Sequence, residues 1–278
     1  MTRVLINGVE SDGTIPVTDS SVLRGDGCFE VLRAYSGRPF ALDEHLDRLA
    51  RSAKALDIPL PGRHELGQWI SDISGSGGDS AVRVVVTRGS VGPGDPAEPV
   101  VVVFAHPWSK GEGPATLLPV EARWHAAGVD WELAGAKVLS YAPNMAATRH
   151  AVAEGFGDAL LTTIEGVMLE GPTFSVAWVV EDVLETPGLE LGILDSITRR
   201  VLLELASELG LEVVESAWAL DRLDDADEVM ALSTIREIQP VAAVGHRRFP
   251  EGPVTADLAR LFYQRVGRTG EQGSGLVP

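Results

Sequence analysis

GAKVLSYAPN, from Gly135 to Asn144, is the stretch on which the interpretation of this chain depends. It places Lys137 in a run with no other charged side chain, four residues before Tyr141. The chain has only three lysines among its 23 basic residues, so lysine is not its usual surface cation. A lysine among apolar neighbours loses hydration of its charged form, its pKa falls, and its amine becomes a nucleophile for aldehydes. The alternative is a strand lysine that extends its ammonium group to solvent.

Composition limits the classes of function. The chain has 278 residues, 45% of them apolar and 23% charged, as in a soluble globular enzyme. Its net charge of -17 would repel a nucleic-acid backbone, so we expect no nucleic-acid partner. No apolar run approaches the roughly 20 residues that span a bilayer, and the first residues lack a signal-peptide pattern, so we expect a cytoplasmic protein with no membrane segment.

Metal and disulfide chemistry have little support in the sequence. The single cysteine, Cys28, excludes an internal disulfide and a cysteine-based metal cluster. The six histidines are scattered and show no zinc-type spacing, so we expect no metal site.

The hydrophobic pattern predicts a mixed α+β fold with at least partly antiparallel sheets. Gly25 and Gly27 permit a close backbone approach or positive φ before a strand from Cys28 to Tyr35. A helix is expected from Leu42 to Leu56, with Asp43 as its N-cap, because apolar residues recur every three or four positions and form a stripe at 42, 46, 49, 53 and 56. Other expected helices cover 63–73, 144–154, 197–209 with residues 197, 201, 205 and 209 on one face, and 254–266; the other expected strands cover 4–7, 81–87, 100–104, 159–163, 167–170, 175–180, 183–186, 212–216 and 228–232.

A Gly- and Pro-rich stretch at residues 110–119 indicates a domain boundary. We therefore predict a smaller N-terminal α/β domain at 1–115 and a larger C-terminal domain at 116–270. The last residues, 271–278, look like a linker and tag remnant.

Four features together match the needs of pyridoxal 5'-phosphate (PLP). Lys137 offers an amine for the cofactor aldehyde, and Glu170, on a strand after a tight turn, offers an acid for the ring nitrogen. The helix start at Ile197-Thr198 and the pair Ser233-Thr234 offer donors for a phosphate dianion.

With these four features the chain resembles the class IV, or fold-type IV, PLP-dependent aminotransferases. That family contains branched-chain aminotransferases, D-amino-acid transaminases, (R)-selective amine transaminases and aminodeoxychorismate lyase. The motifs RGDGCFE (24–30), EHLDRL (44–49), the lysine stretch, LEG (169–171) and STI (233–235) carry the resemblance over nearly the whole chain. It implies a two-domain fold, a cofactor site between the domains and a homodimer.

The resemblance also implies a role for each matching residue. Lys137 would form the internal aldimine and act in catalysis. The implied cofactor-binding residues are Arg48, Lys137, Tyr141, Glu170, Ile197, Thr198, Ser233 and Thr234, with Arg48 on the phosphate and Glu170 on the pyridine nitrogen. The predicted substrate-binding residues are Arg24, Phe29, Arg88 and Ile235.

Four features depart from the family pattern. Arg24 stands where branched-chain enzymes have an aromatic residue, and an arginine there suits a substrate carboxylate. Ser196 replaces the usual glycine before Ile197, and PTF (172–174) replaces a Gly-Ser-Asn run after Glu170-Gly171. The Arg-x-His carboxylate trap of D-amino-acid transaminases is absent after Arg88-Gly89, so activity on D-amino acids would require Arg24 or Arg88.

The expected function is transamination between an amine donor and a 2-oxo acid acceptor. Aminodeoxychorismate lyase is the alternative within the family, because it would use the same lysine to eliminate pyruvate and give 4-aminobenzoate. A non-catalytic member that keeps the fold as a binding protein is a third, less favoured alternative, which an absence of bound cofactor after purification would support.

Overall fold

The computed structural model describes residues 2–75, 78–108, 111 and 113–271. The chain forms two compact units. Unit 1 comprises Met1–Ser109, Ala136–Tyr141 and Val266–Pro278, and unit 2 comprises Lys110–Gly135 and Ala142–Arg265. Both units combine helices with a sheet, which confirms the predicted α+β class. The expected tag remnant at 271–278 lies outside the described residues except for Glu271, which ends a helix.

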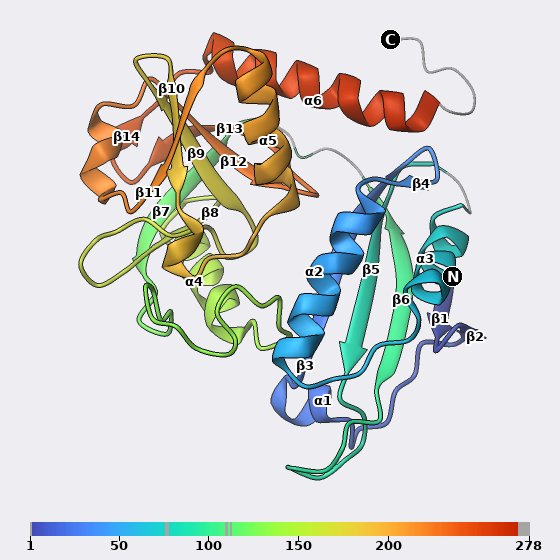
Figure 1. Ribbon diagram of the computed structural model, residues 1–278. Coiled ribbons are helices and arrows are strands. Elements are labelled where there is room, and N and C mark those ends of the chain that lie inside the picture. Colours follow the sequence, from blue (N-terminus) through green and yellow to red (C-terminus); the bar gives the residue numbers. More distant parts are fainter. Residues whose placement is uncertain (1, 76–77, 109–110, 112, 272–278) are drawn as a thin grey trace. The chain divides into compact units, whose positions relative to one another are not determined.

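Unit 1 is built on a six-stranded sheet in the order β2-β1-β6-β5-β3-β4, in which every neighbouring pair is antiparallel (Figure 1). Its strands are β1 (Val4–Ile6), β2 (Val9–Ser11), β3 (Gly27–Tyr35), β4 (Arg38–Pro39), β5 (Ser80–Thr87) and β6 (Val100–Pro107). Asn7 and Gly8 make a tight turn with positive φ angles, and β2 follows directly after this turn.

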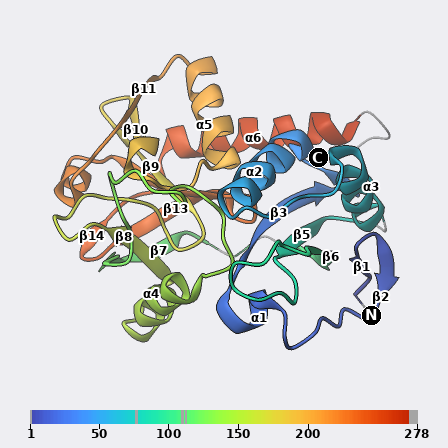
Figure 2. The same cartoon turned by 60° about the horizontal axis from the view of Figure 1, so that its bottom comes forward.

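Two helices, α2 (Leu42–Ala55) and α3 (Arg63–Ser74), lie on one face of this sheet (Figure 2). The predicted stripe is confirmed, since Leu46, Leu49 and Ala53 join the core with alternate residues of β5. The predicted Asp43 cap is wrong. Residue 41 precedes the helix with a φ of 51° and no side chain caps it, while Arg63 holds the Asp43 side chain and carbonyl in the first turn.

The lysine stretch returns to unit 1 and lies against β3, where the two early glycines make room for it. A Cβ atom on Gly25 would lie 2.8 Å from the Ser140 hydroxyl oxygen, and Gly25 has a φ of 70°. A Cβ atom on Gly27 would lie 2.4 Å from the Val86 carbonyl oxygen and 2.7 Å from a Leu139 methyl carbon. The expected close approach and positive φ are therefore both confirmed. The unpredicted helix α1 (Ser20–Arg24) immediately precedes Gly25, with Asp19 as its N-cap.

Unit 2 contains a mixed sheet in the order β11-β10-β9-β12-β13-β7-β8, with β14 paired to β13. Neighbours from β10 to β13 are antiparallel, whereas β10–β11, β13–β7 and β7–β8 are parallel. The strands are β7 (Ala115–Glu121), β8 (Asp158–Thr162), β9 (Ser175–Val180), β10 (Val183–Pro187), β11 (Glu212–Ser216), β12 (Glu228–Ser233), β13 (Glu237–Val244) and β14 (Arg247–Arg248).

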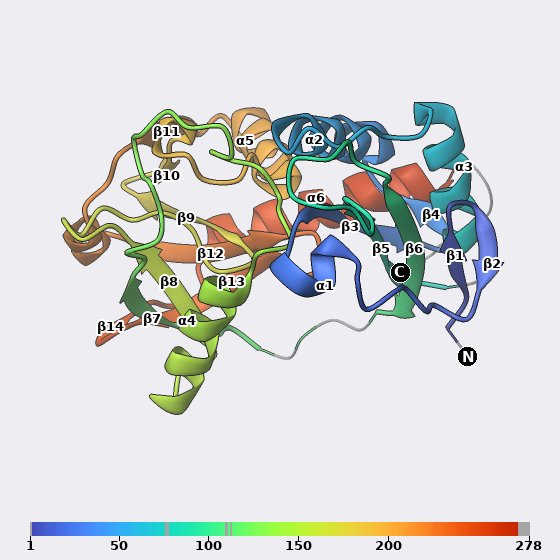
Figure 3. The same cartoon turned by 90° about the horizontal axis from the view of Figure 1, so that it is seen from below.

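Helix α4 (Ala142–Ala153) packs on β7 and β8, and α5 (Ile197–Glu208) packs on β11 and β12 (Figure 3). The predicted apolar face of α5 is partly wrong. Leu205 is buried as expected, but Leu209 is 39% exposed and Leu202 is fully buried in its place. Strand β7 was not predicted either, because its glycine- and proline-rich surroundings indicated a boundary. The remaining helices are η1 (Leu189–Leu191), η2 (Leu220–Asp224) and α6 (Pro253–Glu271).

Within the described part of the chain, none of the helices combines the length and apolar character that a membrane crossing requires.

The close approach at Gly27 predicts a specific cost for a side chain there. Gly27→Ala should destabilise the protein by about 1–3 kcal/mol, because the added methyl group meets a backbone carbonyl that cannot move without disturbing β5. Gly62→Ala is the matched control, since a Cβ atom there meets nothing within 4 Å. Urea-induced unfolding measures both variants, and equal stability of the two would contradict this account.

Candidate active site

The backbone around Lys137 is joined to β3 and α2 by hydrogen bonds. The Lys137 N–H donates to the Ser52 hydroxyl at 3.0 Å, and the Lys137 carbonyl accepts from the Phe29 N–H at 3.0 Å. The Leu139 N–H donates to the Gly27 carbonyl at 2.8 Å. The lysine is thus held like a residue of an extra short strand rather than on a loose loop.

The amine of Lys137 lies beside two aromatic rings that contact each other. Lys137 is only 8% exposed, and its Nζ atom lies 4.4 Å from the centroid of the Phe29 ring. Nζ also lies 3.5 Å from the Tyr141 hydroxyl oxygen, and the Phe29 and Tyr141 rings meet edge to face at 5.2 Å. Three predicted site residues are therefore brought together, and the buried position argues against a lysine that extends to solvent.

A buried ionic cluster of Glu30, His45 and Arg48 lies in the same unit. Arg48 donates through Nε and Nη2 to the two oxygens of Glu30 at 2.7 and 2.8 Å, and His45 Nδ1 lies 2.8 Å from the second oxygen. Glu30 and His45 are at most 1% exposed and Arg48 is 5% exposed. The cluster fixes the orientation of Arg48, the predicted phosphate ligand, because bidentate pairing restricts a planar guanidinium.

Burial and the contacts within the cluster shift the pKa values of its members. Burial alone would raise the pKa of Glu30, but the charge of Arg48 and the hydrogen bonds from Arg48 and His45 outweigh it and hold that pKa well below its usual range. Burial, reinforced by the charges of Arg48 and Lys137, lowers the pKa of His45 despite its bond to Glu30. Burial and the Glu30 charge raise the pKa of Cys28 to about 12, so its thiol stays protonated.

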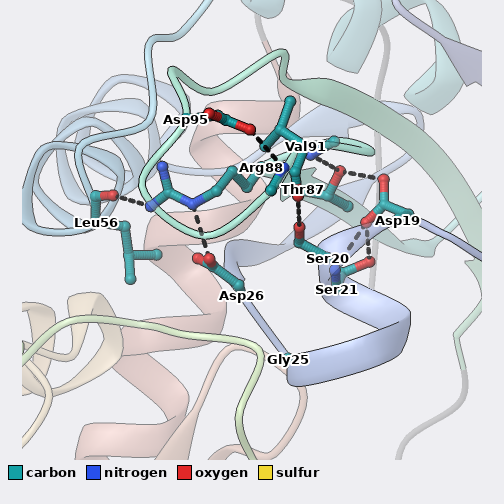
Figure 4. A network of polar contacts seen from close by, with 12 residues as sticks. Asp19, Ser20, Ser21, Gly25, Asp26, Leu56, Thr87, Arg88, Val91 and Asp95 are labelled. Atoms are coloured by element: carbon teal, nitrogen blue, oxygen red, sulfur yellow. Dashed lines mark hydrogen bonds and ion pairs between the residues drawn. The ribbon is translucent and has the colours of Figure 1, made fainter.

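The two arginines expected to meet substrate differ in their surroundings. Arg24 is exposed at the last position of α1. Arg88 donates through Nε to Asp26 at 2.7 Å and through Nη2 to the Leu56 carbonyl (Figure 4). These contacts tie the Gly25-to-Gly27 turn to the end of α2, which gives Arg88 a structural role, whereas its contact with substrate stays a prediction.

In unit 2, Glu170 lies in a braced turn. The Leu194 N–H donates to its two carboxylate oxygens at 3.3 Å each. The Gly171 N–H donates to the Phe174 carbonyl at 2.7 Å, and the Asn144 amide donates to the Pro172 carbonyl at 3.1 Å. The departure from the family pattern at 172–174 therefore leaves the glutamate with hydrogen-bonded support.

The predicted phosphate residues of unit 2 lie at a helix start and at a hairpin tip. Ile197 and Thr198 are 3% exposed in the first turn of α5, and the Ser196 hydroxyl caps this helix by accepting from the Arg199 N–H at 3.3 Å. Ser196 has a φ of -73°, so the position does not require the family's glycine. Ser233, Thr234 and Ile235 lie where β12 turns into β13, and Ile235 is 37% exposed.

Sequence reasoning did not assign roles to Glu30, His45, Asp158 and Arg236. Their polar side chains contact segments that carry predicted site residues. The spacing of His45 and Arg48 was a usable signal, because residues three apart lie on the same face of a helix. Among the described residues, no group of three or more His, Cys, Asp or Glu side chains is arranged to hold a metal ion.

Comparison with known proteins gives a consistent result across the chain. The family model described as amino-transferase class IV matches residues 27–244. A putative branched-chain-amino-acid aminotransferase of Methanocaldococcus jannaschii is 34% identical over 273 residues, which cover 94% of this chain and 95% of that protein. A bifunctional aminodeoxychorismate lyase and D-amino acid transaminase of Mycobacterium tuberculosis is 30% identical, over 87% of this chain and 90% of that one.

Similarity extends to a solved structure with bound cofactor. A hypothetical aminotransferase from Mycobacterium tuberculosis in its PLP-bound form has a TM-score of 0.87 and 27% identity, and the match covers 96% of this chain and 99% of that chain.

The low pKa values of Glu30 and His45 predict stability that is lost in acid. Below its ordinary pKa of 6.5, a histidine of the unfolded chain is protonated while His45 stays neutral, so unfolding takes up a proton. The free energy of unfolding should fall as pH drops below 6.5, by at most about 1.4 kcal/mol per pH unit for one proton. Glu30 adds a second loss below 4.5, where an unfolded glutamate is protonated.

Urea unfolding at pH 5, 6 and 7 checks the histidine part of this dependence. His45→Asn keeps a hydrogen-bond donor but does not titrate, so its pH slope should be shallower than that of the wild type. His64→Asn, at an exposed position in the same unit, should keep the wild-type slope. Equal slopes for the wild type and His45→Asn would refute the assignment.

Proposed function

We infer that this chain, which belongs to the class IV aminotransferase family, is a PLP-dependent transaminase. It transfers an amino group between an amino acid or amine and a 2-oxo acid. We further propose that it acts as a homodimer, as its resemblance to the family implies. The observation that carries the proposal is the buried amine of Lys137, held beside the rings of Phe29 and Tyr141 by a segment that is hydrogen-bonded to β3.

The residues present fit PLP, which is the cofactor of this family. Lys137 has a buried amine for the cofactor aldehyde, and the two contacts with Glu30 hold the Arg48 guanidinium in one orientation. We propose that Arg48, Ile197, Thr198, Ser233 and Thr234 hold the phosphate. Bound PLP supplies an electron sink for the carbon that loses its proton.

Lys137 has two proposed tasks in the reaction. Its amine would hold the cofactor, and the freed Nζ would act as the base that takes the proton from the Cα of the donor and as the acid that gives it up again. The Tyr141 hydroxyl, 3.5 Å from Nζ, gives the amine a polar contact. Phe29 limits access of water to the same atom.

Glu170 is proposed to hold a proton on the pyridine nitrogen. Its carboxylate accepts the Leu194 N–H, which fixes its orientation without supplying a competing cation. Arg24, Arg88, Phe29 and Ile235 are the proposed substrate contacts. Of the two arginines, the exposed Arg24 is better suited to bind a substrate carboxylate, because Asp26 and the Leu56 carbonyl already engage Arg88.

Aminodeoxychorismate lyase is the second candidate. The relative from Mycobacterium tuberculosis supports this candidate, because that protein is named as both an aminodeoxychorismate lyase and a D-amino acid transaminase. A lyase would use the same lysine to release pyruvate and 4-aminobenzoate.

The donor class is tested in a half-reaction without 2-oxo acid. PLP-loaded protein is incubated separately with D-alanine, L-leucine and (R)-1-phenylethylamine, and chromatography after acid denaturation measures the released cofactor. At least one donor should convert PLP into an equal amount of pyridoxamine 5'-phosphate. If none does and aminodeoxychorismate yields 4-aminobenzoate, the lyase alternative replaces the transaminase.

Substitutions separate the two central roles. Lys137→Ala should lower turnover by at least about 10³-fold while some cofactor binding remains, because the base is lost but the phosphate contacts are kept. Glu170→Gln should lower kcat by about 10²-fold or more with a smaller effect on PLP affinity. Turnover and cofactor titration are measured on each variant, and near wild-type activity of Glu170→Gln would remove the assigned role.

A further inference from the structure

We propose that Arg236 is a positioning residue that holds the loop Ser233–Arg236 in the shape needed to bind the cofactor phosphate. The inference rests on the proposed function, since it concerns the phosphate contacts assigned to Ser233 and Thr234. Arg236 was not among the residues to which the sequence assigned a role, and its contacts all lie within unit 2.

Arg236 first closes the loop on itself. Its backbone N–H donates to the Ser233 hydroxyl oxygen at 3.0 Å, which spans the turn that contains Thr234. Its Nη1 donates to the Gln239 side-chain oxygen at 2.8 Å. Gln239 lies on β13, so the guanidinium joins the tip of the hairpin to the strand that follows it.

The same guanidinium anchors the loop to a buried carboxylate. Nη2 of Arg236 donates to Asp158 at 2.6 Å, and Asp158 is only 5% exposed at the start of β8. The other oxygen of Asp158 accepts from the Thr148 hydroxyl at 2.8 Å and from the Ala159 N–H at 2.9 Å. Because its partner is fixed by α4 and β8, the ion pair restricts Arg236 more than an exposed pair would.

A third contact links the loop to the turn that carries Glu170. The carbon at the centre of the Arg236 guanidinium lies 4.6 Å from the Phe174 ring centroid. Phe174 is 3% exposed, and its ring occupies the space beside Gly171, where an added Cβ atom would lie 2.1 Å from a ring carbon. Arg236 therefore contacts the ring that packs against Gly171, and this contact couples the two segments.

Such coupling matters because an unrestrained hairpin tip must lose conformational freedom when it binds a phosphate. A loop that is already ordered loses less, and the difference appears as affinity. Arginine suits the position, since its planar fork can meet Asp158, Gln239 and the ring of Phe174 at once. A lysine has one compact charge and cannot keep all of these contacts.

The test compares PLP with pyridoxal, which lacks the phosphate, in titrations of apoprotein. Arg236→Met should raise the Kd for PLP by about 10- to 100-fold, as expected for loss of charged hydrogen bonds that fix a site, and change the Kd for pyridoxal by less than about threefold. Arg236→Lys should fall between the wild type and Arg236→Met. The ratio of the two Kd values is the deciding quantity, because it reports the phosphate contribution alone.

Arg247→Lys is the matched control. Arg247 lies on β14, which pairs with the opposite end of β13, and its guanidinium also pairs with a carboxylate, that of Asp224. The Arg247→Lys substitution should leave the Kd values for PLP and for pyridoxal unchanged. Thermal unfolding of each variant accompanies the titrations, and if Arg236→Met does not fold, the ratio measured for Arg236→Lys decides.

An unchanged Kd ratio in a folded Arg236 variant would overturn this inference alone. So would an equal loss of affinity for PLP and pyridoxal with a lower Tm, because that pattern indicates a merely structural role. A wild-type protein that binds neither compound would overturn the proposed function, and this inference with it.

Discussion

The lysine stretch depends on its backbone pairing with β3. Two hydrogen bonds, from the Phe29 N–H to the Lys137 carbonyl and from the Leu139 N–H to the Gly27 carbonyl, hold the segment against the strand. That approach is open only because residue 27 has no side chain. The glycine motif near the start of the chain and the lysine more than a hundred residues later are therefore parts of one local structure. Phe29 contributes to it twice, through its backbone and through its ring.

Buried charge in unit 1 follows from the same arrangement. Glu30 alternates with Phe29 on β3, so when the ring faces the lysine the carboxylate lies on the other face, where α2 packs. An ionised carboxylate in that position needs cationic or hydrogen-bonding partners, and Arg48 and His45 supply them. Removing one member would leave a buried charge without its partner, which costs far more than an exposed ion pair contributes.

Local sequence patterns predicted the parts of the fold that depend on local physics. The α2 stripe, the valine strands and the close approach at Gly27 followed from periodicity and from glycine chemistry. The predictions failed where contacts between residues far apart in the sequence determine the local structure. Asp43 does not cap α2 because Arg63, twenty residues away, holds it, and α5 is rotated so that the buried Arg199 reaches Thr186 and Glu215.

The candidate site shows the same division. Motif resemblance identified Lys137, Phe29 and Tyr141, which the structure brings together, but it gave no sign that Arg236 contacts both Asp158 and Phe174. Strand β7 was missed because the glycine- and proline-rich stretch that ends at Pro119 indicated a domain boundary. In the structure Pro119 lies beyond the residues that pair with β13, so its missing N–H breaks no hydrogen bond of that ladder.

Covalent trapping of the cofactor tests the central claim most directly. PLP-loaded protein is reduced with borohydride, digested, and analysed by mass spectrometry for a pyridoxyl group on lysine. With only three lysines in the chain, Lys54, Lys110 and Lys137, the assignment has few competitors. We predict a single label on Lys137. A label on Lys54 or Lys110, or no label on any lysine, would contradict the account.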